Sequence, residues 1–337
     1  QMSLVDTWAA TGAGAFTLSE NGLYTREAWK IFLDRLTPTG IISVSRWFSQ
    51  GQASETSRLI ALAVGALIDR GAIVVPLTDA TAAQHDEFLA LSEAQHVIRL
   101  RDDGTGAAET WSIERLGTEV SHPLLRQLAD TQRSGLVVFS SGSTGASKGM
   151  VHDLDRTLSK FTTRRAPFVT VTFLLFDHMG GINTLFHTLS NGGTIVATRD
   201  RAPDAVCALV EQHKVELLPV SPTFLGLVLL SEAHVRHDLS SLRLVTYGTE
   251  MMPQATLDRV RAALPWVEFR QTYGLSETGA LRTKSREDGS LWLKVGGEGV
   301  ETKVVDGTLW VRSPWAVLGY LNAPDPSQIH PVPGLRI

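Results

Sequence analysis

Short apolar runs alternate with amphipathic stretches from residue 72 onward. The runs are rich in valine, isoleucine and leucine, which predicts buried β-strands at 73–77, 97–100, 136–139, 171–176, 194–197, 215–220 and 242–246. Between them, apolar positions recur at helical spacing with a polar outer face at 83–93, 204–213 and 253–264. Strands that alternate with helices favour mostly parallel sheets covered by helices on both faces, so the expected fold class is α/β.

The pattern changes after Glu287. Short β-like segments at 290–295, 299–305 and 308–312 are separated by glycine and aspartate, which is typical of small antiparallel sheets. We therefore expect an N-terminal α/β domain over 71–286, a small antiparallel β subdomain over 287–326 and a tail at 327–337.

Composition limits the classes of partner. The 337 residues are 43% hydrophobic and carry a formal net charge of -4, so the chain can bury a large core and has no electrostatic reason to bind nucleic acid. Cys207 is the single cysteine, which excludes an internal disulfide and favours a cytoplasmic location. No apolar run reaches the length of a membrane span, and no signal peptide is evident. Because the sequence opens on Gln1, we expect a fragment or a processed chain.

A loop of small hydroxylated residues and glycines follows the apolar run at 136–139 and ends in Lys148. Glycine lets backbone N–H groups turn toward an anion, the hydroxyls add donors and the lysine adds charge, so the pattern predicts a nucleotide phosphate loop. A Walker loop would require glycine at 147 and Ser or Thr at 149, where this chain has Ser147 and Gly149. A flexible linker is the remaining alternative. The candidate binding residues are Ser140, Ser141, Gly142, Ser143, Thr144, Gly145, Lys148 and Gly149. We expect the loop between a strand ending near Phe139 and a helix beginning after Met150.

The segment from Ser140 to Gly149 resembles the signature of the adenylate-forming superfamily, which includes acyl-CoA synthetases, nonribosomal-peptide adenylation domains and luciferases. Later segments resemble further signatures of that family in their usual order, namely Tyr-Gly-Thr-Glu at 247–250, Tyr-Gly-Leu-Ser-Glu-Thr at 273–278 and Gly-Tyr at 319–320. The resemblance covers about 72–325.

The resemblance implies that ATP and Mg²⁺ are the cofactors and that a carboxylate attacks the α-phosphorus. Lys148 and its loop would hold the β- and γ-phosphates, Ser276 would donate to the α-phosphate and Glu277 would bind Mg²⁺ through a hard oxygen. The adenine pocket would be formed by Tyr273, Gly274, Thr249 and Glu250. A core tyrosine is the alternative for Tyr273, and Thr249 stands where the family has a second glycine.

The segment around His178 bears on the acyl substrate. Phe176-Asp177 is similar to amino-acid-activating domains, in which the aspartate pairs with an ammonium group, whereas His178 followed by Gly180-Gly181 more closely resembles acyl- and aryl-CoA ligases. We therefore predict a small carboxylic acid as substrate, with His178 as a catalytic residue and a core histidine as the alternative. The acceptor is expected to be coenzyme A or a carrier-protein thiol. His152 and His187 are expected to be solvated or structural.

Both ends of the chain differ from the family pattern. Residues 1–70 resemble the distal part of a spermidine-synthase-like Rossmann domain, either as a fused segment or as padding at a sheet edge, which makes an S-adenosyl-ligand-dependent aminopropyl or methyl transferase fragment a second alternative. After Asn322 the resemblance would require a Thr-Gly-Asp segment, an arginine hinge and a domain with a catalytic lysine, none of which precedes Ile337. We expect a truncated ligase with at most slow pyrophosphate exchange, or a catalytically inactive nucleotide-binding or interaction remnant.

Overall fold

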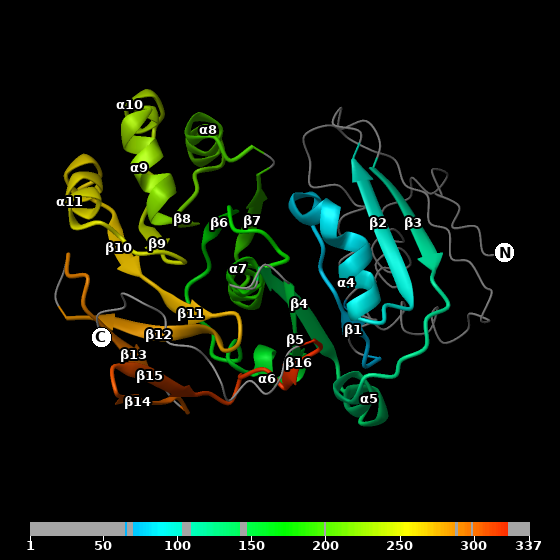
Figure 1. Ribbon diagram of the computed structural model, residues 1–337. Helices are drawn as coiled ribbons and strands as arrows, with labels where there is room; N and C mark the ends of the chain where they lie inside the picture. The colour runs from blue at the N-terminus through cyan, green and yellow to red at the C-terminus, as the bar shows by residue number, and fades with distance from the viewer. Residues whose placement is uncertain are drawn as a thin grey trace, which may run out of the picture. The chain divides into compact units, whose positions relative to one another are not determined.

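A computed structural model describes residues 65, 70–102, 109–141, 147–198, 200–286, 289–297 and 299–322 (Figure 1). The chain divides into two compact units, one formed by Gln1–Val74 with Glu93–Gly135 and the other by Val75–Ser92 with Leu136–Ile337. Every described candidate site residue belongs to the second unit. None of the described helices is long and apolar enough to cross a membrane.

The first unit contains β1 (Ile73–Val74), β2 (His96–Asp102), β3 (Glu109–Arg115) and α5 (Pro123–Asp130). β2 and β3 pair antiparallel over their full length, with Ile98 opposite Ile113. β2 matches the strand predicted at 97–100, whereas β3 was not predicted, because charged residues interrupt its apolar pattern. α5 begins at a proline, which lacks the N–H that a first helical turn leaves unpaired, and buries Leu125 and Leu128.

A five-stranded sheet forms the centre of the second unit. Its order is β10-β9-β8-β6-β7, and all of its strand pairs are parallel. The strands are β6 (Val169–Thr172), β7 (Thr194–Ala197), β8 (Leu217–Val220), β9 (Leu244–Tyr247) and β10 (Glu268–Gln271). β8 is buried along its whole length, as expected for a central strand covered on both faces.

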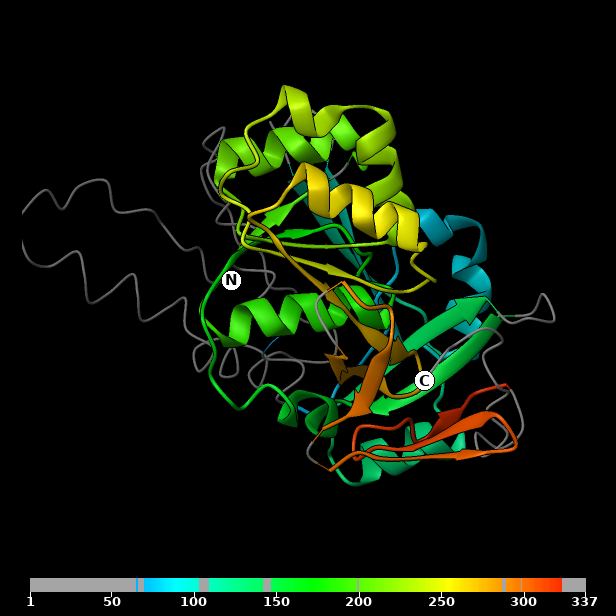
Figure 2. The same cartoon turned by 90° about the vertical axis from the view of Figure 1, so that its left-hand side faces the viewer.

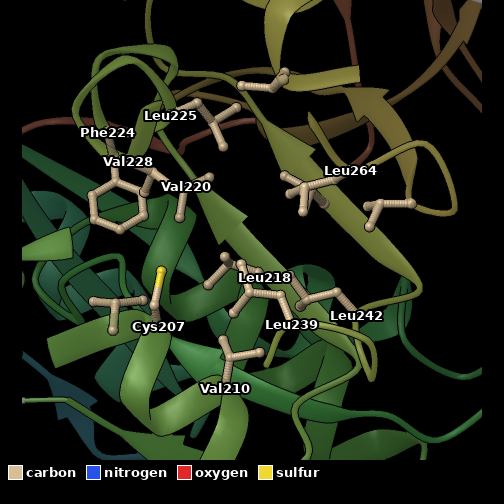
Figure 3. Packing of buried hydrophobic residues seen from close by; sticks show 14 of the residues in the cluster. Cys207, Val210, Leu218, Val220, Phe224, Leu225, Val228, Leu239, Leu242 and Leu264 are labelled. Atoms are coloured by element: carbon tan, nitrogen blue, oxygen red, sulfur yellow. The ribbon is translucent and has the colours of Figure 1, made fainter. Parts of the chain in front are cut away.

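Helices cover both faces of this sheet. They are α7 (Met179–Ser190), α8 (Pro203–His213), α9 (Pro222–Leu230), α10 (Ala233–Arg236) and α11 (Gln254–Ala263). Figures 1 and 2 show α7 on the opposite face from α8, α9 and α11. On the latter side Cys207 and Val210 of α8 and Phe224 of α9 pack with strand residues such as Leu218 in one apolar core (Figure 3). The predicted α/β class is confirmed.

Smaller sheets complete the second unit. β4 (Gly135–Ser141), β5 (Ser147–Asp153) and β16 (Gly319–Tyr320) are successive neighbours in one sheet. β11 (Tyr273–Leu275), β12 (Gly279–Ser285) and β13 (Leu293–Gly296) form an antiparallel sheet, and β14 (Glu301–Val305) pairs antiparallel with β15 (Thr308–Arg312). The expected antiparallel strands near the C-terminus are thus present. The remaining elements are η1 (Asp79–Gln84), α4 (His85–Leu91) and α6 (Leu154–Ser159).

The predicted phosphate loop is followed by a strand and not by the expected helix. Residues 147–153 form β5, so the helix begins at Leu154 and not directly after Met150. Residues 149–153 are all buried, and a strand covered on both faces lacks the apolar-polar alternation that would identify it. The helix starts where the Asp153 side chain accepts a hydrogen bond from the Arg156 N–H, an N-cap.

Candidate functional site

The two ends of the predicted phosphate loop lie on adjacent strands. Ser140 and Ser141 end β4, and Ser147, Lys148 and Gly149 begin β5. The intervening candidates lie outside the described residues, namely Gly142, Ser143, Thr144 and Gly145. Strand pairing therefore fixes both ends of the loop.

Close packing favours glycine at position 149. A Cβ atom there would lie 2.9 Å from Cε1 of Phe139 and 3.0 Å from Cδ1 of Leu321, so a larger residue would have to push these two side chains aside. The strand carrying Lys148 can therefore approach its neighbours closely.

The segment around β16 contacts the start of β5, where the predicted phosphate loop ends. Tyr320 lies opposite Met150, and the Asn322 side chain accepts from the Gly149 N–H at 3.2 Å and donates to the Ser147 carbonyl at 2.7 Å. The Lys148 Nζ lies 5.8 Å from the centroid of the Tyr320 ring, within the range of a cation–π contact.

Ser276 and Glu277 lie in the turn between β11 and β12, which pair antiparallel with Gly274 opposite Ala280. A Cβ at Gly274 would lie 2.7 Å from the Gly279 carbonyl oxygen and 2.8 Å from the Ala280 Cα. Both contacts are with backbone, so the tightness of this hairpin depends on the glycine. The hairpin holds the half-buried Glu277 at its turn.

The Tyr320 hydroxyl donates to Oε1 of Glu277 at 2.8 Å. Burial raises the pKa of Tyr320, and the hydrogen bond and charge of Glu277 raise it further, so the phenol stays a donor at neutral pH. Tyr320 thus contacts both Lys148 and Glu277, which joins three sequence motifs in one site. The Gly-Tyr motif was visible in the sequence, but no role was predicted for its tyrosine.

The predicted adenine-pocket residues have diverse surroundings. Tyr273 is half-buried and packs against the apolar cluster of Leu281, Leu293 and Val295, and burial, with the Glu277 charge, raises its pKa. Thr249 is exposed and has a left-handed backbone with φ of 71°, a conformation that glycine adopts more easily.

Glu250 contacts a helix terminus. Its Oε1 accepts from the Thr223 N–H at 2.8 Å, in the first turn of α9. Burial disfavours its charge, but hydrogen bonds from Thr223 and Ser221 outweigh this and lower the pKa of Glu250. The carboxylate therefore satisfies a free helix donor, a structural role that nothing in the local sequence indicated.

His178 directly precedes α7, and its side chain is 55% exposed. Asp177 beside it is buried, and Oδ2 of Asp177 accepts hydrogen bonds from the hydroxyls of Thr78 and Thr81. The other carboxylate oxygen, Oδ1, lies 3.8 Å from Nε2 of His178 and has no hydrogen-bond partner among the described residues. Asp177 thus connects the start of α7 to the segment at η1.

A pocket of about 240 Å³ lies beside these residues. Its lining includes Ser140 and Ser147 from the two ends of the phosphate loop, together with Asp177 and His178. Its apolar side includes Phe88 and Phe139, whose rings stack at 4.0 Å between centroids. The pocket brings the loop termini and His178 to one place.

Two ionisable groups without a predicted role are buried in the same unit. His152 of β5 is 1% exposed, and burial lowers its pKa to about 4; the Ser276 backbone opposes this shift and the Lys160 charge adds to it. Burial also lowers the pKa of Lys160 to about 8. Of the two alternatives expected for His152, solvated or structural, its burial agrees with the structural one. No cluster of three or more His, Cys, Asp or Glu side chains that could hold a metal occurs in the described part of the chain.

Comparison with known proteins identifies the family. The family model described as AMP-binding enzyme matches residues 7–321, so this chain belongs to that family. The match includes most of residues 1–70. Within that range the structure describes only residues 65 and 70, so the resemblance to a spermidine-synthase-like domain stays a prediction.

Similar curated proteins are coenzyme A ligases by name. The chain is 25% identical over 233 residues to 4-coumarate–CoA ligase-like 3 of Arabidopsis thaliana, covering 62% of this chain and 42% of that protein. It is 25% identical over 256 residues to the 3-[(3aS,4S,7aS)-7a-methyl-1,5-dioxo-octahydro-1H-inden-4-yl]propanoyl:CoA ligase of Mycobacterium tuberculosis, covering 69% of this chain and 49% of that protein. The matches thus span less than half of each relative.

A solved structure supports the fold. E. coli MenE, with a bound phenylether-linked analogue of OSB-AMS, aligns with a TM-score of 0.55 at 20% identity and covers 78% of this chain and 57% of that one.

Proposed function

We propose that this member of the AMP-binding enzyme family binds ATP with Mg²⁺ and activates a simple carboxylic acid as its acyl-adenylate. The observation that carries the proposal is the contact of Tyr320 with both Glu277 and Lys148, at 2.8 Å to Oε1 and with Nζ at 5.8 Å from the ring centroid. Tyr320 thus lies between Lys148, a cation at the end of the predicted phosphate loop, and Glu277, a carboxylate that can bind a hard metal ion.

The reaction requires one bond to form and one to break. A carboxylate oxygen of the acid attacks the α-phosphorus, and the bond from that phosphorus to the oxygen bridging to the β-phosphorus breaks, so pyrophosphate leaves with the electron pair. Negative charge builds on the phosphate oxygens, where preorganised donors such as Lys148 and the Ser276 hydroxyl are most effective.

Glu277 fits the role of metal ligand. It is half-buried, and only Oε1 accepts the Tyr320 hydrogen bond, so Oε2 can face a cation. Because no three-residue metal cluster occurs among the described residues, Glu277 would share the ion with nucleotide phosphate oxygens. Bound Mg²⁺ would neutralise phosphate charge.

Asp177 favours a simple acid over an amino acid. An aspartate that pairs with a substrate ammonium needs an accessible oxygen, but Oδ2 already accepts from Thr78 and Thr81 and Oδ1 is buried beside His178. Freeing Oδ2 would break the contacts with Thr78 and Thr81 that position η1, and Oδ1 is inaccessible to solvent. The exposed side chain of His178 lines the pocket and is available to contact the substrate carboxylic acid.

The names of the relatives support a second half-reaction, in which the acyl group is transferred from AMP to a thiol. The two curated proteins compared above are named as CoA ligases or CoA-ligase-like, so we propose that the acyl group passes to the thiol of coenzyme A or of a carrier protein. The sulfur of that thiol would form a bond to the acyl carbon, the thiol proton would be lost, and the bond from this carbon to the phosphate oxygen would break, so that AMP leaves.

Matched substrates test the choice of acid. ATP–pyrophosphate exchange is measured with 3-phenylpropanoic acid and with phenylalanine, which share a carbon skeleton and differ by the α-ammonium group. We expect faster exchange with the simple acid, across this pair and similar pairs. Faster exchange with the amino acids would contradict the substrate assignment, and failure to bind ATP would contradict the function as a whole.

A further inference from the structure

Lys160 directly follows α6 and has a buried ammonium group. Its Nζ is inaccessible to solvent and has no hydrogen-bond partner among the described residues. The Phe161 ring lies beside it, with 4.9 Å from Nζ to the ring centroid. Burial alone lowers the pKa of this lysine, to about 8, so most molecules carry the charge at neutral pH.

The buried ammonium lies against the turn that carries Ser276 and Glu277. Nζ is 3.2 Å from the position that a Cβ at Gly279 would occupy, and Cε of Met179 is 3.3 Å from the same point. Gly279 has a left-handed φ of 66° and ends the turn at the start of β12. Lys160 therefore reaches the backbone of the turn without a side chain between them.

The Lys160 charge affects two nearby histidines. Lys160 lowers the pKa of His152 on β5 and of His187 on α7, and Arg165 also lowers that of His187; for both histidines burial is the larger cause. Lys160 and Arg165 are the cations that shift these histidines, and no carboxylate is among the causes of the shifts. Burial of the Lys160 ammonium without a partner is unfavourable unless a counter-ion approaches.

We propose that Lys160 is a positioning residue for the nucleotide phosphates, acting through the turn from Ser276 to Gly279. This inference rests on the proposed function, which places the α-phosphate at Ser276 on that turn. A charge held in an interior of low dielectric acts over a longer distance than one in water. Its field would favour phosphate binding and would help to hold the turn in place, without direct contact with the substrate.

The stability of a variant separates this role from a structural one. Replacing Lys160 by Met keeps the length of the side chain and removes an unpartnered buried charge, which commonly leaves a fold unchanged or more stable. A structural lysine would instead lose stability and ATP affinity together. Lys284→Met is the matched control, because Lys284 lies on the adjoining strand β12 and is exposed.

The experiment measures Mg²⁺-dependent ATP binding by calorimetry and thermal unfolding for the wild type, Lys160→Met and Lys284→Met. We expect Lys160→Met to bind ATP about tenfold more weakly with an unchanged or higher unfolding temperature, and Lys284→Met to match the wild type. Equal ATP affinity in Lys160→Met, or a parallel loss of stability and affinity, would overturn the inference.

A proton-linkage measurement makes the test more specific. An anion near Lys160 stabilises its charged form, so ATP binding at pH 8.5 should take up protons in the wild type, detected as a dependence of the binding enthalpy on buffer ionisation. The uptake should disappear in Lys160→Met and persist in Lys284→Met. The same uptake in all three proteins would overturn the inference, whereas a wild type that fails to bind ATP would overturn the proposed function itself.

Discussion

The Tyr320 hydroxyl donates a 2.8 Å hydrogen bond to Oε1 of Glu277, across 43 positions of sequence. Main-chain pairing of β16 with β5 sets this contact, because Tyr320 lies opposite Met150, two residues beyond Lys148. The carboxylate proposed to bind Mg²⁺ and the end of the phosphate loop are therefore held in register by the same short strand.

Tyr320→Phe removes the hydrogen bond to Glu277 and keeps the aromatic ring beside Lys148. Groups that orient a metal ligand typically contribute 10- to 100-fold to metal affinity, so we expect about a tenfold loss in ATP affinity in the presence of Mg²⁺. Binding of ATP without Mg²⁺, measured by the same calorimetry, is the internal control and should not change. An equal loss with and without Mg²⁺ would argue against a role through Glu277.

Gly274→Ala should separate β11 from β12, because its Cβ would lie 2.7 Å from the Gly279 carbonyl oxygen. Overpacking against backbone costs about 1–3 kcal/mol of unfolding free energy, and displacement of the turn should also weaken ATP binding. Gly296→Ala is the control, since position 296 on β13 has no atom within 4 Å of a new Cβ. Urea unfolding measures both variants, and similar destabilisation of the two would refute the prediction.

His152 should make the fold sensitive to acid. Its pKa is lowered from 6.5 to about 4 in the folded chain, so the unfolded chain binds the proton more tightly below pH 6.5. The stability contributed by the neutral ring is complete above that pH and is lost as pH falls toward 4, by about 2 kcal/mol between pH 7.5 and pH 5.

The test of His152 compares urea unfolding of the wild type and His152→Leu at pH 7.5 and pH 5. Between pH 7.5 and pH 5 the unfolding free energy of the variant should fall by about 2 kcal/mol less than that of the wild type. His187 and the carboxylates contribute equally to both proteins, so they cancel in this comparison. An identical pH dependence would show that His152 is not buried as a neutral ring.

Thr78→Val tests the link between Asp177 and η1. The variant keeps the side-chain shape but removes a donor to a buried carboxylate, which should cost about 1.5–3 kcal/mol of unfolding free energy. Thr283→Val, which removes a bond to the neutral Gln271 carbonyl, should cost about 1 kcal/mol. Chemical denaturation measures both, and a smaller cost for Thr78→Val would contradict the role given to Asp177.

Apolar periodicity was sufficient to predict most of the parallel sheet. Strands such as β8 and β9 are short, largely buried and rich in branched residues, which is the pattern that the sequence shows. It failed at β5, where Lys148 and Gly149 precede a segment buried on both faces, because neither alternation nor a long apolar run marks such a strand.

The motifs of the candidate site were visible in the sequence, but their contacts were not. Nothing local to Tyr320 indicates that its hydroxyl reaches Glu277, because the contact depends on how β16 pairs with β5. Lys160 had no signal at all, since a lysine at the end of a short polar helix is normally solvated. Glu250 matched a family motif, yet its carboxylate contacts the N-terminus of α9.

Calorimetric titration of ATP into the wild type and Glu277→Gln, each with and without Mg²⁺, tests whether ATP binds through Mg²⁺ held by Glu277. The glutamine keeps the size of the side chain and removes the charge that a hard cation requires. We predict that Mg²⁺ strengthens ATP binding to the wild type and has little effect on Glu277→Gln. Equal affinity and equal Mg²⁺ dependence in the two proteins would contradict it.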